Sequence, residues 1–218
     1  AVGAGSLKLG CTGALGTVAG ITSVTSGATL DLNGITLATA EPLTLNGVGV
    51  GGTAGALTNS SGTAASYSGL LTLAGNSSIV TNAGDINITN VGTITGATRA
   101  LTLGGTGNGS VSSIVGTTTG TMTKAGTGTW TLSGASTYTG LTTVSAGTLK
   151  LGATGAGANT PLGTTGAGTT VTSGATLDLN GFTLATAEAL TLNGLGVGSA
   201  AGALTNSAAG AASYSGAI

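Results

Sequence analysis

The sequence predicts an all-β protein built as a parallel β-helix, in which short strands stack in rungs along one axis. Three observations lead to this fold class. Apolar and polar residues alternate in many short runs, glycine and asparagine turns separate the runs, and one long stretch occurs twice. Alternation with period two indicates strands with one buried face, and a unit that recurs within one chain is typical of a solenoid.

Composition supports an ordered chain with a narrow core. The 218 residues include 44 glycines and are 40% hydrophobic, 4% charged and 2% aromatic. Disorder requires low hydrophobicity and high net charge, so we expect order. A large globular core would need bulky aromatic side chains, whereas Leu, Ile, Val, Ala and Thr fill a β-helix. Rungs of roughly 20–28 residues with strands about 4.8 Å apart give about eight to eleven rungs in one continuous rod over residues 1–218.

The predicted strands follow the alternating runs in order. They are SLKL (6–9), ATLDL (28–32), PLTL (42–45), GALT (55–58), GLLTL (69–73), DINIT (85–89), GTIT (92–95), ALTL (100–103), GTMT (120–123) and GTWTL (128–132). Asn-Gly, Ser-Gly, Gly-Ala and Gly-Thr pairs between them predict turns. Because no window combines helical spacing with caps, we expect little or no helix.

The internal duplication is nearly exact. Residues 23–69 recur at 170–216 with 38 identities in 47 positions, an offset of 147. The match extends backwards, since SLKLG at 6–10 corresponds to TLKLG at 148–152 with five extra residues in the second connecting loop. The long repeat is therefore 142–147 residues. Near-identical units are expected to present the same surfaces for stacking.

A motif in the second half resembles a known family. Residues 124–140 read KAGTGTWTLSGASTYTG and continue as LTTVSAGTLKLG, followed by VTSGATLDLNG. This run resembles the autotransporter-associated β-strand repeat of bacterial autotransporter passengers and other giant surface proteins. One complete signature covers about 124–181, and the tail and continuation of another cover 6–34. Residues 48–120 are expected to form rungs, but they carry no part of this family motif.

The resemblance implies a right-handed parallel β-helix exported to the bacterial cell surface, with a role in adhesion, matrix or scaffolding. It supplies no catalytic residues, because the repeat is structural in that family. The predicted partners are other copies of the same protein, contacted head to tail or laterally, and surface glycans. The chain starts inside one signature and stops inside the next copy, so we expect either a longer polypeptide or end-to-end docking.

Charge and hydropathy exclude other partners. The four basic residues, Lys8, Arg99, Lys124 and Lys150, are too scattered to form a phosphate-binding patch. No apolar run approaches the roughly 20 residues of a membrane helix. The chain has no histidine and one cysteine, which argues against transition-metal sites and cofactors. Calcium remains an option through Asp and carbonyl oxygens, although the known loop motifs are absent.

The enzyme hypothesis depends on recurring acids. Glycoside hydrolysis needs two carboxylates about 5–9.5 Å apart, and the pair Asp31 and Glu41 recurs as Asp178 and Glu188. Alternation in TLDLNG places Leu30 inside and Asp31 outside beside the turn. A solvated surface acid is the favoured interpretation, and a β-helical carbohydrate-active enzyme is the weakest alternative.

Other residues suggest surface contacts. Tyr67 and Tyr214 occupy equivalent positions and, with Tyr138, are candidate lateral or adhesive contacts, with packing in turns as the other reading. Thr-x-Thr triplets at 93–95, 121–123 and 129–131 suggest a hydroxyl surface of the ice-binding type. Cys11 is expected to be a small residue of a turn or core, and a reactive or intermolecular thiol is the alternative. We therefore predict a non-catalytic structural segment of an extracellular or surface fibre or adhesin; an adhesive module for glycans or crystalline surfaces is the alternative.

Overall fold

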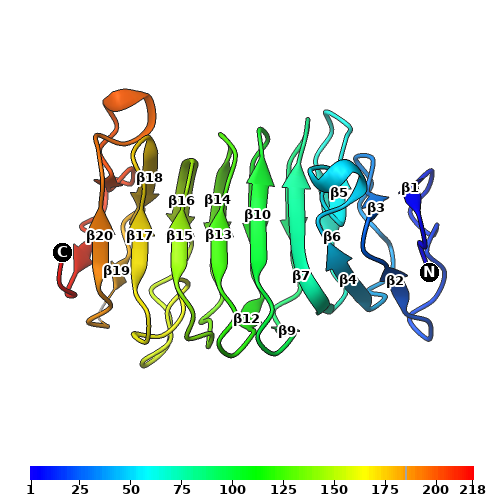
Figure 1. Ribbon diagram of the computed structural model, residues 1–218, viewed down its shortest axis with the longest axis horizontal. Coiled ribbons are helices and arrows are strands. Elements are labelled where there is room, and N and C mark those ends of the chain that lie inside the picture. The colour runs from blue at the N-terminus through cyan, green and yellow to red at the C-terminus, as the bar shows by residue number, and fades with distance from the viewer. Residues whose placement is uncertain (185) are drawn as a thin grey trace.

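The protein is an all-β parallel β-solenoid of about nine turns, seen here in a computed structural model that describes residues 1–184 and 186–218. The rungs lie side by side along the long axis, and the two termini lie at opposite ends (Figure 1). Helix in the described residues is confined to two single 3-10 turns, η1 (Val50–Gly52) and η2 (Val197–Ser199). The predicted fold class is confirmed.

Two long sheets and one short sheet form the walls. The first sheet has 13 strands: β1 (Gly5–Lys8), β2 (Thr22–Val24), β3 (Ala28–Asp31), β4 (Leu43–Gly47), β5 (Leu57–Asn59), β7 (Leu71–Thr81), β9 (Thr93–Thr95), β10 (Leu101–Gly105), β12 (Ile114–Gly116), β13 (Met122–Lys124), β15 (Thr142–Val144), β17 (Thr169–Val171) and β20 (Leu190–Leu192). The second has seven: β6 (Ala65–Tyr67), β8 (Ile86–Ile88), β11 (Gly109–Val111), β14 (Thr129–Leu132), β16 (Gly147–Leu151), β18 (Ala175–Asp178) and β21 (Leu204–Thr205). The third pairs β19 (Thr183–Leu184) with β22 (Ser213–Tyr214).

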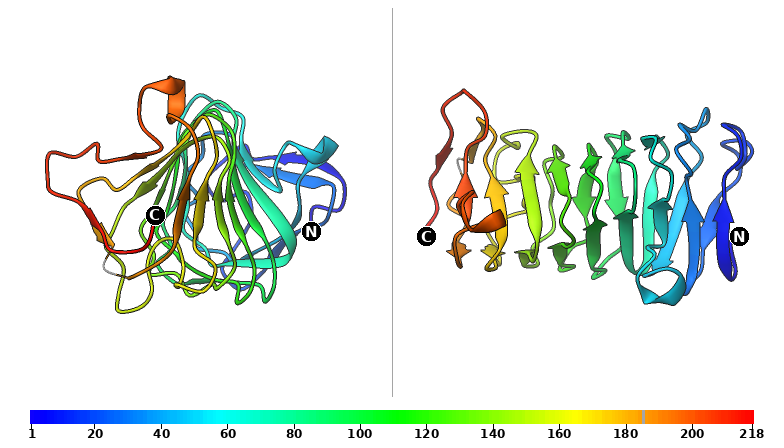
Figure 2. Two further views of the ribbon diagram at one scale, coloured as in Figure 1. Left: turned by 60° about the vertical axis from the view of Figure 1, so that its left-hand side comes forward. Right: turned by 90° about the horizontal axis from the view of Figure 1, so that it is seen from above.

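All named strand pairs are parallel, and their register gives the rung length. Trp130 pairs with Leu149, 19 residues later, and Thr183 pairs with Ser213, 30 residues later. These extremes lie close to the predicted range. The longer rungs place their additional residues in loops. The loops that carry η1 and η2 project beyond the outline that the strands share (Figure 2).

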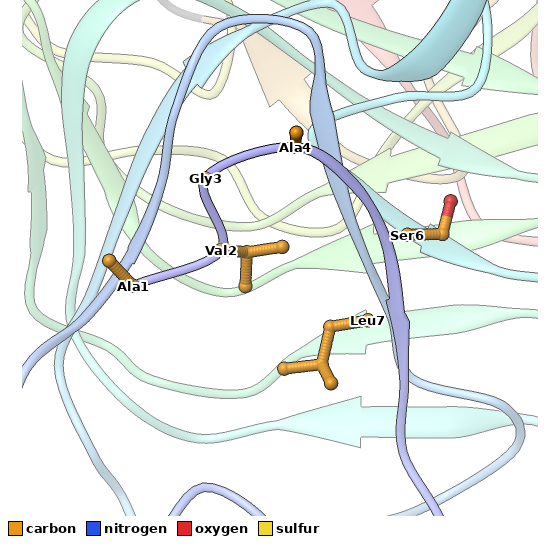
Figure 3. Close-up of a pocket in the computed structure, with 6 residues that line it drawn as sticks. All are labelled: Ala1, Val2, Gly3, Ala4, Ser6 and Leu7. Carbon is orange, nitrogen blue, oxygen red and sulfur yellow. The ribbon is translucent and has the colours of Figure 1, made fainter.

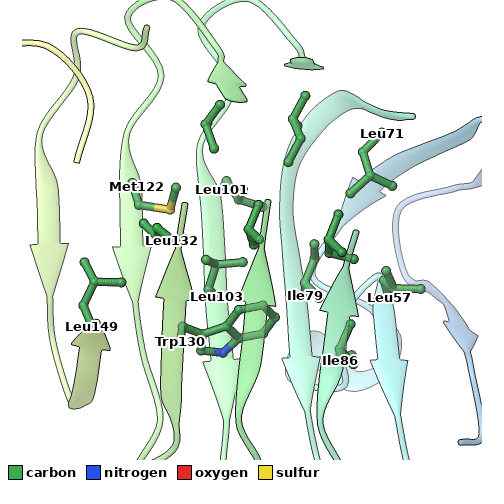
Figure 4. Packing of buried hydrophobic residues seen from close by; sticks show 14 of the residues in the cluster. Leu57, Leu71, Ile79, Ile86, Leu101, Leu103, Met122, Trp130, Leu132 and Leu149 are labelled. Atoms are coloured by element: carbon green, nitrogen blue, oxygen red, sulfur yellow. The ribbon is translucent and has the colours of Figure 1, made fainter. Parts of the chain in front are cut away.

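The core lies between the two long sheets and consists mainly of aliphatic side chains. Rows of Leu, Ile and Val from successive rungs stack inward (Figure 4). Trp130 is the largest buried side chain, and its indole Nε1 donates to the carbonyl of Gly104 at 3.1 Å. The neighbouring rung carries Gly109 opposite it, where an added Cβ would stand 2.5 Å from the ring. The Trp130 ring therefore fits because Gly109 has no side chain.

Every predicted strand overlaps a strand of the structure, but several strands were missed. Residues 65–67, 109–111 and 114–116 form β6, β11 and β12. Their sequences, ASY, GSV and IVG, are short and contain glycine, alanine or serine, which are weak strand formers. Pairing with strands on adjacent rungs holds these segments extended.

Candidate functional site

The three tyrosines lie in the interior or at its margin. Tyr67 is 0% exposed and Tyr138 is 1% exposed. Tyr67 ends β6 in register with Ile88 of β8, and its hydroxyl donates a hydrogen bond to the backbone carbonyl of Glu41. The expectation that Tyr67 and Tyr138 make lateral contacts is wrong, because their rings fill the rung interior. Tyr214 is partly exposed and remains a candidate contact.

Tyr138 belongs to a buried chain of hydroxyls. Its phenolic oxygen lies 2.6 Å from Oγ1 of Thr142, which donates to the carbonyl of Leu162 at 3.0 Å. Since Thr142 has one hydroxyl proton, the tyrosine must be the donor between the two. Burial raises the pKa of Tyr138 above its ordinary value. The phenol therefore stays neutral and acts as a structural donor.

Two buried glutamates occupy equivalent places in the two copies. Thr22 donates to Oε1 of Glu41 at 2.7 Å, and Thr169 donates to Oε1 of Glu188 at 2.6 Å. In the described part of the chain, Oε2 of each glutamate has no hydrogen-bond partner. Burial raises the pKa of Glu188 to about 7, against a weaker opposing hydrogen bond from Thr169. This carboxyl can therefore carry a proton near neutral pH.

The recurring aspartates are buried, contrary to the expectation of a solvated surface acid. Asp31 is 6% exposed and Asp178 is 3% exposed. Oδ1 of Asp31 accepts from the amides of Asn33 at 2.9 Å and Ser60 at 3.0 Å, and Oδ2 accepts from the Ser60 hydroxyl at 2.5 Å. Alternation along one strand could not show that the turn of the next rung covers the outer face.

The second copy repeats this arrangement. Oδ1 of Asp178 accepts from the amides of Asn180 and Ser207, both at 2.9 Å, and Oδ2 accepts from the Ser207 hydroxyl at 2.5 Å. Burial alone would raise the pKa of Asp178, but these hydrogen bonds and nearby Lys150 outweigh it, so the pKa is lowered. The carboxylate is therefore ionised and fully engaged in joining two turns.

Asp31 and Glu41 bind different parts of the rungs. Asp31 binds the turn at Ser60, whereas Glu41 binds Thr22, and the two share no hydrogen-bond partner. Within residues 1–184 and 186–218, no three His, Cys, Asp or Glu side chains come together as a metal site. Cys11 is exposed in the loop after β1, so it is no part of the core.

A buried lysine was missed by sequence reasoning. Lys124 is 0% exposed, and its Nζ donates to the carbonyls of Ala125 at 2.9 Å, Gly126 at 2.8 Å and Ala146 at 2.9 Å. Burial lowers its pKa to about 8. The signal was present in the sequence, since Lys124 follows Met122 at the inward spacing of a strand. The ammonium thus ties together turns of two successive rungs.

The threonine triplets do not form one surface. They lie on β9, β13 and β14, which belong to different ladders. Register instead produces a different row of hydroxyls across six rungs of the first sheet, namely Ser78, Thr102, Thr123, Thr143, Thr170 and Thr191. The sequence pattern alone does not indicate this row, because its members lie 20–27 residues apart.

Two of the hollows on the described surface have no titratable side chain in their linings. One of about 240 Å³ lies at the first rung and is lined by Ala1, Val2, Gly3, Ala4, Ser6 and Leu7 (Figure 3). The other, of about 460 Å³, lies beside the η1 loop and is lined by Val48, Gly52, Thr53, Ser78, Val80, Thr102, Gly104, Gly105, Ala125 and Gly126. Serine and threonine hydroxyls are the only polar side chains in these two linings.

Comparison with known proteins identifies the repeat class. Residues 122–151 match the family model of the passenger-associated-transport-repeat. This segment spans Lys124, Trp130 and the strands β13 to β16, so the resemblance to autotransporter passenger repeats is confirmed. Repeats of this kind imply a secreted or surface protein.

No curated protein and no solved structure matches the chain. Among the described residues, no helix is long and apolar enough to cross a membrane.

Proposed function

We propose that the protein is a structural segment of a long bacterial fibre or adhesin, outside the cell or on its surface, and that it performs no catalysis. The observation that carries this proposal is the unbroken parallel ladder from β1 to β20, with a passenger-type repeat inside it. Backbone hydrogen bonds run along the axis through all these rungs, which makes a stiff rod. Stacked aliphatic rows seal its interior.

The charge distribution supports a structural role. Asp31 and Asp178 hold turns, Lys124 binds three carbonyls, and Glu41 and Glu188 are sealed from solvent. None of these groups lines either of the two hollows described above. The neutral outer surface gives little self-repulsion between rods, so other copies are the proposed partners, end to end or side by side. Surface glycans are a further proposed partner.

Immunogold labelling of intact cells that make the protein tests this role. Antibodies against the folded chain are expected to label extended structures outside the cell envelope. Permeabilised cells should bind no more antibody than intact ones, because the epitopes are already accessible. Label confined to the cytoplasm, or an even internal distribution released only by permeabilisation, would contradict the proposal.

A further inference from the structure

The loop that carries η1 stands beside a hollow on the outer face of the first sheet. The hollow has a volume of about 460 Å³, and its lining comes from this loop and from β7, β10 and β13. The loop projects from the rod (Figure 2). Val48 is 45% exposed and Val50 is 38% exposed, although further rungs lie on both sides of this loop. One patch of the surface therefore carries both a projecting apolar loop and a recess.

The backbone carbonyls in the floor of the hollow have partners inside the solenoid. The carbonyl oxygen of Gly104 accepts from Nε1 of Trp130 at 3.1 Å. The carbonyl oxygens of Ala125 and Gly126 accept from Nζ of Lys124 at 2.9 Å and 2.8 Å. A polar atom that already has a partner loses little when a bound group excludes water. An apolar side chain can therefore cover these three carbonyls at a low cost in free energy.

Gly104 keeps the hollow open although the backbone does not require glycine there. Its φ lies outside the left-handed region, and an added Cβ would stand 3.8 Å from the carbonyl oxygen of Ala125, which is an ordinary contact. Gly105 differs, because its φ is 107° and an added Cβ would stand 2.1 Å from the carbonyl oxygen of Thr81. Glycine inside a strand weakens the strand and is typical of a place that another chain approaches closely. Gly104 therefore indicates a contact surface.

We infer that this patch binds the same patch of a second copy, with the η1 loop of each copy in the hollow of the other. A twofold contact requires one surface that carries both complementary features. Here they are adjacent, since Val48 and Thr53 of the loop line the hollow. Residues 47–56 and the lining contain no charged residue, so two identical patches do not repel each other.

The loop has its binding conformation before any contact forms. The amide of Val50 donates to Oγ1 of Thr29 at 3.0 Å, and the amide of Gly55 donates to the carbonyl of Val48 at 2.9 Å. A loop that is already fixed loses little conformational entropy on binding. The inference gives a site to the side-by-side contact between copies, and it rests on that part of the proposed function.

Analytical ultracentrifugation of the full chain tests the inference, with a reducing agent present because Cys11 is exposed. We expect a concentration-dependent dimer with twice the mass of the 19.9 kDa chain. Gly104→Val should raise the Kd of this dimer about tenfold or more, because the new side chain fills the hollow. The matched control Thr170→Val alters the outer face of the same sheet outside the hollow and should leave the Kd unchanged. Circular dichroism checks that both variants fold.

A charge exchange tests whether the two loops meet. Val50→Asp should abolish the dimer, because two like charges would then face each other, and Val50→Lys should do the same. An equimolar mixture of the two variants should dimerise again. Loss of folding in either variant could not produce this recovery.

Three results would each overturn the inference. They are a chain that stays monomeric at all concentrations, a Gly104→Val dimer as tight as that of the unaltered protein, and a mixture that associates no better than either Val50 variant alone. Binding of maltoheptaose to a monomeric chain, lost in Gly104→Val, would assign the hollow to a glycan and also overturn it. A surface location found by immunogold labelling would stand in every case, so the two failures are distinguishable.

Discussion

The two copies of the 47-residue unit have nearly the same sequence but different neighbours. Leu57 is 0% exposed under β7, whereas its counterpart Leu204 is partly exposed at the last rung. Tyr67 and Tyr214 differ in the same way. For these two residues the local sequence sets the inward direction, and the adjacent rung completes the burial.

Other contacts are the same in both copies. The hydrogen bonds from Ser60 to Asp31 and from Ser207 to Asp178 have the same length. The turns η1 and η2 have the same backbone conformation, with Gly51 at φ 65° and Gly198 at φ 64°. These contacts use partners from inside the unit. The unit therefore specifies its turns by itself, while its core is completed by stacking.

The largest expected effect is the difference in stability between Ala variants of Leu57 and Leu204. Leu57→Ala should lower the free energy of unfolding by about 2–5 kcal/mol, because it leaves a cavity under a covering rung. Leu204→Ala should cost roughly half of that or less, because its side chain is partly in water already. Urea denaturation of both variants gives the two values. Equal losses would mean that the last rung is covered in solution.

A smaller effect concerns pH. Burial raises the pKa of Glu188 to about 7 from an ordinary 4.5, so the folded state keeps a proton that the unfolded state releases between these values. Stability should therefore fall as pH rises from about 4.5 to 7, by an amount on the order of 3 kcal/mol. Glu188→Gln should flatten this part of the profile.

Thermal unfolding across the same pH range checks the prediction. The amide oxygen of Gln can still accept from Thr169, so the variant removes the titration and keeps that hydrogen bond. Glu41→Gln serves as the matched variant in the first copy. A Glu188→Gln profile as steep as that of the unaltered protein would show that the slope has another origin.

The smallest expected effect concerns two surface ion pairs. Nζ of Lys150 lies 3.5 Å from Oδ2 of Asp178, and Nζ of Lys8 lies 3.9 Å from Oδ2 of Asp31. Lys150→Met should cost about 0.2–1 kcal/mol, and Lys8→Met should cost less because its side chain is more exposed. Both losses should shrink at about 1 M salt. A larger loss for Lys8→Met would reverse this ranking.

The fold class was predictable from the sequence because each strand alternates and the unit recurs. Trp130 and its glycine-rich surroundings were recognisable as a motif for the same reason. What could not be predicted depends on contacts across rungs. Asp31 was placed in solvent because its cover, Ser60, is 29 residues away, and Tyr138 was placed outside although its partner Thr142 lies inside.

Lys124 makes the pairing of neighbouring rungs more specific than an all-aliphatic core would. Rungs with similar inward residues can pair with the wrong neighbouring rung at little cost in free energy, since Leu and Val fit most inward positions. In register, Lys124 stands between Leu103 and Val144 and finds its three carbonyls. A displaced pairing would remove the Ala146 carbonyl and leave the ammonium with only the two carbonyls of its own turn. The hydrogen bond from Lys124 to Ala146 therefore favours the native alignment of these two rungs over a displaced one.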